Sequence, residues 1–535
     1  MKAIKGKPFF AGIHVHDRKS LACTKASEVM PEPDEAYISL SQSLGRPAEP
    51  CVEKGQKVKE GEVIAKAAGP ISSDVFASIA GEVTDIKPLT GANGGTETYI
   101  VIKGDKSGEK KYFEPLTNPD EESIKERIKE CGIVGLGGAG FPTAVKVAPK
   151  SSVDTLILNG AECEPYLTCD HRLMLEHTDE IVRGARLIAQ TLTVDKIYIG
   201  IEANKPDCIA AFEGYDDIQP VILKKQYPMG SEKHLIYVCT GRKVGIGKLP
   251  ADSGVVVQNV ATAFAVCEAV EKGKPLYERI LTVSGEAVKE PKNLWVRVGT
   301  AVKDIVEYCG GESQPPKKVV QGGPMTGLAL STYDVYTHKT TSGVLLMSKA
   351  EAAAEEPTPC LNCGKCADVC PMHLMPMQTA FYSAAGDFEA AAKLGNTLAC
   401  IECGACEYTC PAKRPLIQAI RKTKAYMRAQ QTKAAPTPIV KPVDQKGKSA
   451  PIVAEDQKPS GEYVDKHDVK TERPAAAPAN AEGKKPTPAP ATAETPVSQT
   501  AAEAQVAPPK PAETAIPAET QSPAENKEET KREEN

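Results

Sequence analysis

The sequence predicts a multidomain protein of mixed α/β and α+β structure that ends in a disordered tail. Three observations support this prediction: short apolar runs between glycine turns near 48–103, strand-like runs alternating with helical ones over 120–272, and eight cysteines crowded between Cys360 and Cys410. With 535 residues the chain is long enough for several separate cores. A formal net charge of −5 is small for this length, so nothing global indicates nucleic-acid binding.

The N-terminal part predicts a barrel-sandwich hybrid β-domain, which we expect to span 1–115. The runs EPCVEKGQKVKEGEVIAKAAG and DVFASIAGEVTDIKPL indicate short strands separated by glycine turns. This pattern is similar to the hairpins of biotinyl and lipoyl carrier domains. A carrier needs a lysine on the exposed turn, where this sequence has ISSDV (71–75), so a structural β-domain without a prosthetic group is favoured.

A second domain, expected at 116–272, has the alternation of a layered α/β protein. VDTLILNG (153–160), DKIYIGIE (195–202) and PVILKK (220–225) predict buried parallel strands, and the segments between them have helical apolar spacing. The apolar stretch 254–270 predicts a buried helix, too short and polar to span a membrane. Two strands and a helix over 278–311 then predict a small α+β domain, expected at 273–350.

The strongest signal is a duplicated cysteine pattern followed each time by proline. Three closely spaced thiolates can surround one 4Fe–4S cluster while the fourth cysteine of each run reaches the other cluster. We therefore expect one cluster on Cys360, Cys363, Cys366 and Cys410, and a second on Cys370, Cys400, Cys403 and Cys406. Paired C-x-x-C motifs also bind zinc, but this duplicated arrangement favours iron–sulfur. The sequence thus predicts a helical, ferredoxin-like two-cluster domain at 351–430.

Beyond 430 the composition changes to Pro, Ala, Lys, Glu and Thr, with Tyr463 as the last aromatic residue. Such a segment cannot bury enough apolar surface to offset chain entropy. We expect residues 431–535 to be disordered. The N-terminus lacks the apolar core of a signal peptide, which favours a reducing cytosol.

A glycine loop in the second domain is a candidate phosphate site. Its residues Gly135, Gly137, Gly138 and Gly140 let backbone N–H groups approach a phosphate, and Lys146 supplies a cation. The segment before the loop indicates a helix, whereas a dinucleotide fingerprint requires a strand. Alone, the loop is also compatible with a turn that binds nothing.

Polar residues that follow the strand at 153–160 strengthen this candidate. Asn159, Glu162 and Glu164 lie at its carboxyl end, where open α/β sheets bind ligands. Asn159 could hydrogen-bond a flavin ring, and the two glutamates could meet ribose or amide groups of a nicotinamide cofactor. Solvated surface glutamates are the alternative.

The motifs GLGGAGFPTAVK, NGAECEPYLTCDHRLM, YPMGSEKHLI and VVVQNVATAFAV resemble the NAD(H)/FMN domain of the flavin subunit of respiratory complex I. The chain departs from that family at Leu136 in place of arginine, at Ala161 in place of aspartate, and at Ser231–Lys233 in place of a G-E-E-T loop. With the N-terminal hairpins and the two cysteine runs, these departures instead resemble the C subunit of the Rnf electron-transport complex, over roughly 5–430. The block 275–311 is similar to the β-grasp (SLBB) domain of both families.

The resemblance implies an oxidoreductase subunit with FMN, NAD(H) and two 4Fe–4S clusters, and no catalytic acid or base. It places FMN contacts at Gly135, Gly137, Gly138, Lys146, Asn159, Glu162 and Asn259, with Gly140 in the same loop, and NAD(H) contacts at Phe141 and Glu164. Hydride would pass between NAD(H) and FMN, and single electrons would pass through the clusters.

The resemblance also implies partners and a location. These are membrane subunits that move an ion, a cluster-bearing subunit that accepts electrons from ferredoxin, and a peripheral position on the cytoplasmic face of the cell membrane. Two alternatives stay open: the diaphorase module of a soluble hydrogenase or formate dehydrogenase, and a flavin-free cluster relay.

Overall fold

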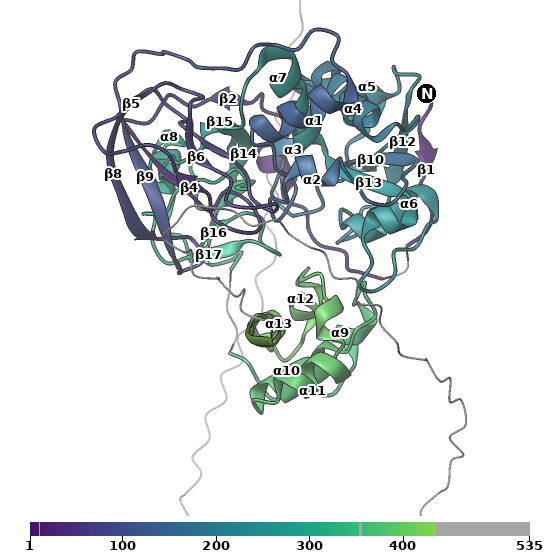
Figure 1. The fold of residues 1–535 in the computed structure, drawn as a ribbon. Helices are drawn as coiled ribbons and strands as arrows, with labels where there is room; N and C mark the ends of the chain where they lie inside the picture. Colours follow the sequence, from purple (N-terminus) through teal and green to yellow (C-terminus); the bar gives the residue numbers. More distant parts are fainter. Residues whose placement is uncertain (10, 353–355, 435–535) are drawn as a thin grey trace, which may run out of the picture. The chain divides into compact units, whose positions relative to one another are not determined.

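A computed structural model describes residues 1–9, 11–352 and 356–434 (Figure 1). In this part of the chain a parallel sheet with helices, two small antiparallel β-sheets, a mixed sheet and a helical unit follow the predicted multidomain class. The tail predicted to be disordered over 431–535 begins too early, because helix α13 (Leu416–Ala434) continues through residues 431–434. Its remaining part, 435–535, lies outside the described residues. Among the described residues, no helix combines the length and apolar character that crossing a bilayer requires.

The centre of the α/β unit is a five-stranded parallel sheet with the order β1-β12-β11-β10-β13. Its long strands closely match the three predicted ones, and the N-terminal strand adds an edge that the sequence did not suggest. The strands are β1 (Ile4–Lys5), β10 (Thr155–Gly160), β11 (Lys196–Glu202), β12 (Ile218–Leu223) and β13 (Val255–Asn259).

Helices cover both faces of this sheet, which explains its continuous apolar strands. Side chains alternate along β10: Leu156 and Leu158 pack under the larger helical layer, and Ile157 packs under α6. Figure 1 shows α6 on the side of the sheet opposite to α4 and α7. The helices are α1 (Glu121–Glu130), α2 (Thr143–Lys146), α3 (Cys169–Glu176), α4 (Thr178–Leu192), α5 (Pro206–Phe212), α6 (Glu232–Thr240) and α7 (Val260–Lys272).

The prediction of one buried helix over 254–270 is wrong in its first third. Val255–Asn259 form β13, because three consecutive β-branched valines pair in register with the neighbouring strand β10. Asn259 then ends the strand and caps α7, since its Oδ1 accepts a hydrogen bond from the Ala261 N–H at 2.8 Å. The break places Asn259 at the carboxyl edge of the sheet.

Two antiparallel sheets form the N-terminal β-domain, with the orders β3-β9-β8-β5 and β4-β6-β7. Their inner faces share one apolar core that includes Ile38, Ile64 and Ile100. The strands are β3 (Glu35–Ser39), β4 (Glu49–Pro50), β5 (Lys57–Val58), β6 (Val63–Lys66), β7 (Val75–Phe76), β8 (Gly81–Thr90) and β9 (Thr96–Gly104).

The predicted small α+β domain contains a six-stranded mixed sheet of order β17-β16-β18-β14-β15-β2. The N-terminal strand β2 pairs with β15, so this sheet also draws on a distant part of the chain. Its elements are β2 (Glu28–Val29), β14 (Glu278–Ser284), β15 (Lys292–Arg297), α8 (Val302–Tyr308), β16 (Lys318–Gln321), β17 (Leu328–Leu330) and β18 (Gly343–Met347). The domain boundaries given above stay predictions.

The cysteine-rich segment is helical, as its sequence predicts. Helix α10 packs against both α11 and α13, and α9 against α12. The helices are α9 (Lys365–Asp368), α10 (Pro376–Ala384), α11 (Phe388–Leu394), α12 (Ala405–Thr409) and α13 (Leu416–Ala434).

Candidate cofactor sites

The two cysteine runs repeat not only in sequence but also in backbone conformation. Left-handed residues recur 40 positions apart: Asn362 and Glu402, Gly364 and Gly404, His373 and Lys413. The first pair turns a backbone N–H toward a thiol, since Asn362 N–H contacts Cys360 Sγ at 3.5 Å and Glu402 N–H contacts Cys400 Sγ at 3.3 Å. A duplicated loop that aims N–H groups at sulfur is typical of cluster ligation.

The four cysteines predicted for the second cluster lie around one cavity. Its lining comprises Cys370, Cys400, Cys403 and Cys406, together with apolar side chains such as Ile417 and Ile420. Burial raises the pKa of the Cys403 thiol to about 11, so without a metal this thiol is protonated at neutral pH, whereas a bound metal favours the thiolate. The predicted combination of one cysteine from the first run with three from the second therefore has a geometric basis. These thiols fit a 4Fe–4S cluster.

The other four cysteines form a more open group. Cys366 and Cys410 are partly buried electrostatic neighbours, although they come from different runs. Cys360 and Cys363 are exposed. The first cluster would therefore lie nearer to solvent than the second.

The glycine loop lies between α1 and α2, at the edge of the parallel sheet. The Gly135 N–H donates to the Phe141 carbonyl at 2.9 Å, which closes the loop, and Leu136 N–H donates to Thr262 Oγ1 at 3.0 Å. The side chain of Leu136 is buried in the core, whereas residues 137–139 are exposed. A Cβ added at Gly138 would meet nothing within 4 Å. This backbone is accessible to a ligand, as a phosphate cradle requires.

Two asparagines stand beside this loop, one at the end of each neighbouring strand. Asn159 Nδ2 donates to the Gly230 carbonyl at 2.8 Å, and Asn259 Nδ2 donates to Asp170 Oδ2 at 2.8 Å. A Cβ added at Gly137 would approach Asn259 Nδ2 to 2.9 Å. The structure thus brings together the predicted residues Gly137, Asn159 and Asn259 at the carboxyl edge of β10 and β13.

Glu162 is buried below this edge rather than solvated. Its Oε1 accepts the Asp170 N–H at 2.7 Å, and its Oε2 lies 3.5 Å from the Lys19 Nζ. Lys19 belongs to the 3-10 helix η1 (Lys19–Leu21) and also donates to the carbonyls of Glu164 and Leu167. Glu162 therefore shapes the loop that follows β10.

Of the three remaining predicted contact residues, two bond to other residues of the protein and one directly follows the glycine loop. The Glu164 carboxylate accepts from Met325 N–H at 3.1 Å and Thr326 Oγ1 at 2.5 Å, and burial raises its pKa. Lys146 Nζ lies 2.6 Å from Glu232 Oε1 and stays partly exposed. Phe141 is half-buried directly after the glycine loop.

Family models match the chain in four blocks. Residues 7–107 match the RnfC barrel sandwich hybrid domain, 128–268 the Nuo51 FMN-binding domain, 280–329 the SLBB domain, and 359–425 the 4Fe-4S dicluster domain. These matches confirm the predicted fold class and the predicted FMN and 4Fe–4S cofactors.

Relatives that match most of the chain identify its family. The C subunit of the proton-translocating ferredoxin:NAD(+) oxidoreductase complex of Clostridium ljungdahlii is 46% identical over 435 residues, which cover 79% of this chain and 94% of that protein. The C subunit of the Na(+)-translocating complex of Acetobacterium woodii is 41% identical over 80% of this chain and 99% of the relative. The chain belongs to the family of Rnf C subunits. The predicted resemblance and the oxidoreductase class are confirmed.

A third Rnf C subunit, from Rhodobacter capsulatus, is 41% identical over 72% of this chain and 76% of its own length. Among solved structures, an NAD+-reducing [NiFe]-hydrogenase in the H2-reduced state has a TM-score of 0.40 at 21% identity, covering 60% of this chain and 63% of that one. That similarity is too low to support an argument for the diaphorase alternative.

In this Rnf C subunit, sequence reasoning missed Asp170, Tyr227 and Lys19. Asp170 follows the N-G-A-E-C-E-P motif closely, so its position in the sequence could have indicated a place in the site. Lys19 lies 143 residues from Glu162 in sequence, so no local pattern could have connected them. Tyr227 belongs to the YPMGSEK motif, but only the structure shows its hydroxyl donating to the Cys403 carbonyl.

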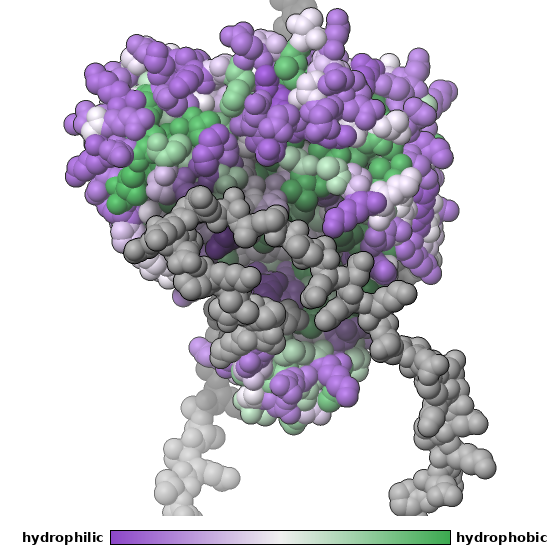
Figure 2. All heavy atoms as spheres, in the orientation of Figure 1, coloured by the Kyte–Doolittle hydropathy of each residue, from purple (hydrophilic) through white to green (hydrophobic). Residues whose placement is uncertain are grey.

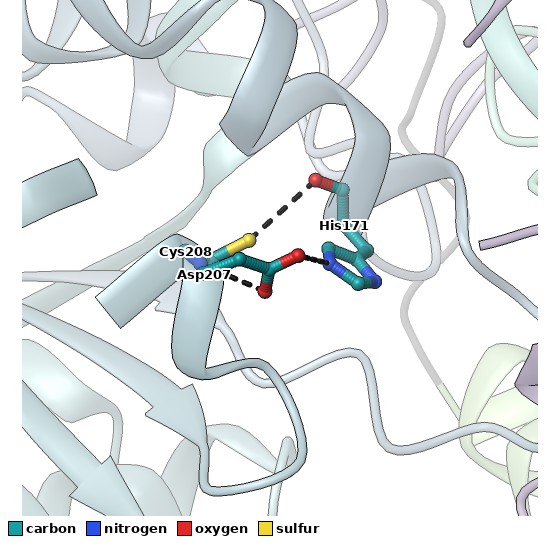
Figure 3. A group of neighbouring side chains, drawn as sticks. All are labelled: His171, Asp207 and Cys208. Atoms are coloured by element: carbon teal, nitrogen blue, oxygen red, sulfur yellow. Dashed lines mark hydrogen bonds and ion pairs between the residues drawn. The ribbon is translucent and has the colours of Figure 1, made fainter. Parts of the chain in front are cut away.

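A separate polar group joins α3 to α5 in the same domain (Figure 3). His171 Nε2 lies 2.9 Å from Asp207 Oδ2, and Cys208 Sγ lies 3.6 Å from the His171 carbonyl oxygen. Asp207 Oδ1 also accepts the Cys208 N–H at 2.9 Å. These groups satisfy one another, so we interpret the cluster as a helix–helix contact of the Rnf C fold.

Asp170→Asn should increase the free energy of unfolding at neutral pH and change it little at acidic pH. Burial, and then the charge of Glu162, raise the pKa of Asp170 to about 6. The folded state therefore holds the proton more tightly than the unfolded chain, and this group's destabilisation grows as pH rises from about 4 to about 6. The variant should gain about 2 to 3 kcal/mol at pH 7 and little at pH 4. Urea unfolding of both proteins across this range tests it; a pH-independent difference would contradict it.

Proposed function

We propose that this chain is the NAD(H)-side electron-transfer subunit of an Rnf-type complex. Hydride passes between NAD(H) and FMN, and the clusters carry the electrons onward one at a time. The observation that carries the proposal is the exposed glycine-loop backbone beside Asn159 and Asn259, in the same described body as a cavity lined by Cys370, Cys400, Cys403 and Cys406. When bound, FMN supplies the exchange between two-electron and one-electron chemistry.

For FMN we propose contacts from the glycine loop, from the two strand ends and from one cation. These residues are Gly135, Gly137, Gly138, Gly140, Lys146, Asn159, Glu162 and Asn259. For NAD(H), Phe141, which is half-buried directly after the glycine loop, is one proposed contact. Glu164 is the other proposed contact, and its carboxylate would have to exchange Met325 and Thr326 for the cofactor.

The more exposed cluster is the proposed point of electron exchange with a partner. Leu361, between the exposed ligands Cys360 and Cys363, is 65% exposed, and Phe381 on α10 is 70% exposed. Figure 2 shows apolar surface among hydrophilic residues over the helical unit. Apolar surface near a cofactor suits a docking face. We propose that a cluster-bearing subunit, which receives electrons from ferredoxin, docks there, with membrane subunits moving the ion and this chain peripheral on the cytoplasmic face.

Cofactor analysis of the anaerobically purified chain tests this function. We expect about eight irons, equal sulfide and one FMN per chain, with flavin absorbance bleached by NADH. Iron without flavin would contradict the flavin role and leave a cluster relay. Recovery in the membrane fraction of the native cell is expected for the Rnf assignment, whereas a soluble diaphorase would stay in the cytosol.

A further inference from the structure

One loop reaches from the proposed flavin site to a cluster ligand. The Gly230 carbonyl at one end of the loop accepts from Asn159 Nδ2 at 2.8 Å, and its N–H contacts Cys163 Sγ at 3.3 Å. Three residues earlier, the Tyr227 hydroxyl donates to the Cys403 carbonyl at 2.6 Å. The loop therefore contacts the residues of both cofactor sites directly.

Among the described residues, Tyr227 is one of three donors from outside the cysteine-rich segment that hold the backbone of the second cluster. The Gly12 N–H donates to the Val369 carbonyl at 3.1 Å, and His234 Nε2 lies 2.9 Å from the Pro371 carbonyl. Val369 and Pro371 flank the ligand Cys370, and the Tyr227 acceptor belongs to a ligand itself. Each bond thus fixes a carbonyl at, or next to, a cysteine of the same cluster.

The space between the two sites is packed with side chains. Ile13, Tyr227, Cys403 and Ala405 form a buried apolar cluster with Cys163 at its border. The backbone of Tyr227 pairs with Ile13 in both directions, at 2.8 and 2.9 Å, which holds the ring in place. Tyr227 is only 3% exposed.

We propose that Tyr227 is the positioning residue that fixes the second cluster (Cys370, Cys400, Cys403 and Cys406) against the flavin site, which makes this cluster the first electron acceptor from the flavin. The inference rests on the proposed function and names its internal route. With the cofactors bound, NADH would give two electrons to the flavin as a hydride, and these would leave one at a time through this cluster; Tyr227 would neither gain nor lose an electron or a proton. The more exposed cluster follows as the second carrier.

Stopped-flow reduction of the complete, cofactor-loaded protein by NADH tests this role. Flavin bleaching gives the first phase, and the EPR signal of the reduced cluster in freeze-quenched samples gives the second. In Tyr227→Phe, which keeps the ring, we expect an unchanged first phase, a several-fold slower second phase and a lower midpoint potential of this cluster. In Tyr227→Leu we expect the second phase to slow by at least about ten-fold, as small misplacements of reacting groups do.

The matched control is Tyr277→Phe, which removes the hydroxyl of another buried tyrosine, bonded to Glu60 far from both sites in sequence. It should leave both phases unchanged. Cluster reduction in Tyr227→Phe and Tyr227→Leu at the wild-type rate would overturn the proposal. If Tyr227→Leu loses iron, the isosteric Tyr227→Phe decides alone. Failure of NADH to bleach the wild-type flavin would instead contradict the proposed function.

Discussion

Replacing Cys370 by alanine should remove one cluster and leave the other. We expect the purified variant to contain roughly half of the iron and sulfide of the wild type, because each 4Fe–4S cluster takes four cysteines. FMN content and bleaching by NADH should persist, since the glycine loop lies in another domain. Electron delivery from NADH to the more exposed cluster should be lost. Iron, sulfide and flavin analysis measures the cofactor content, flavin absorbance measures bleaching by NADH, and EPR of the reduced protein measures electron delivery.

Double variants test which cysteines share a cluster. If Cys370 belongs with the second run, adding Cys400→Ala to Cys370→Ala should cost no further iron. Adding Cys360→Ala instead should remove the remaining half. The reverse result would show that each run holds its own cluster, and would contradict the shared cavity as the basis for ligand assignment. Zinc in place of iron would contradict both arrangements.

Gly138→Val should weaken FMN binding without weakening the fold. The position is exposed and has no neighbour within 4 Å of an added Cβ, so a side chain can begin there without displacing a protein atom. It would occupy the space through which a phosphate approaches the backbone N–H groups. We expect the Kd for FMN to rise by roughly ten- to a hundred-fold, equivalent to a loss of about 1.4 to 2.8 kcal/mol. Fluorescence titration of the flavin-free protein measures it.

Gly214→Val is the matched control, because this glycine has only one neighbour, the Ala211 carbonyl at 3.8 Å, and lies away from the loop in sequence. It should leave the affinity unchanged. Gly137→Val is less informative, since its Cβ would also displace Asn259. Unchanged FMN affinity in Gly138→Val, with normal stability in urea, would argue against the glycine loop as the phosphate site.

Local patterns in the sequence predicted much of the fold. The β-branched runs at 153–160 and 195–202 form β10 and β11, because strands buried on both faces have no polar alternation to obscure them. The cysteine spacing also indicated which residues of the two runs share a cavity. The error at 254–270 arose because a short apolar run is compatible with a strand or a buried helix until its partner strand is known.

The parts of the candidate site that were not predicted depend on contacts between residues far apart in the sequence. Lys19 reaches Glu162 and Tyr227 reaches Cys403, and neither pair lies on a common element. Whether Glu164 is solvated or binds a ligand also depends on which residues lie against its carboxylate. Only the folded chain places Met325 and Thr326 against that carboxylate. The assignment of individual FMN and NAD(H) contacts therefore stays a prediction.

The edge strand β1 has a consequence for biosynthesis on the ribosome. Ile4 pairs with Val221, 217 positions later in the chain, and among the described residues β12 is the only strand paired with β1. At about 5–20 residues per second, the ribosome needs roughly 10 to 40 s to supply that neighbour. During this interval the nascent segment must avoid pairing with other strands. The brevity of β1, and the lysines at positions 2, 5 and 7 around it, are features that protect an unpaired edge from aggregation. The parallel sheet can thus close only after β12 has emerged, and the cysteine runs follow later still.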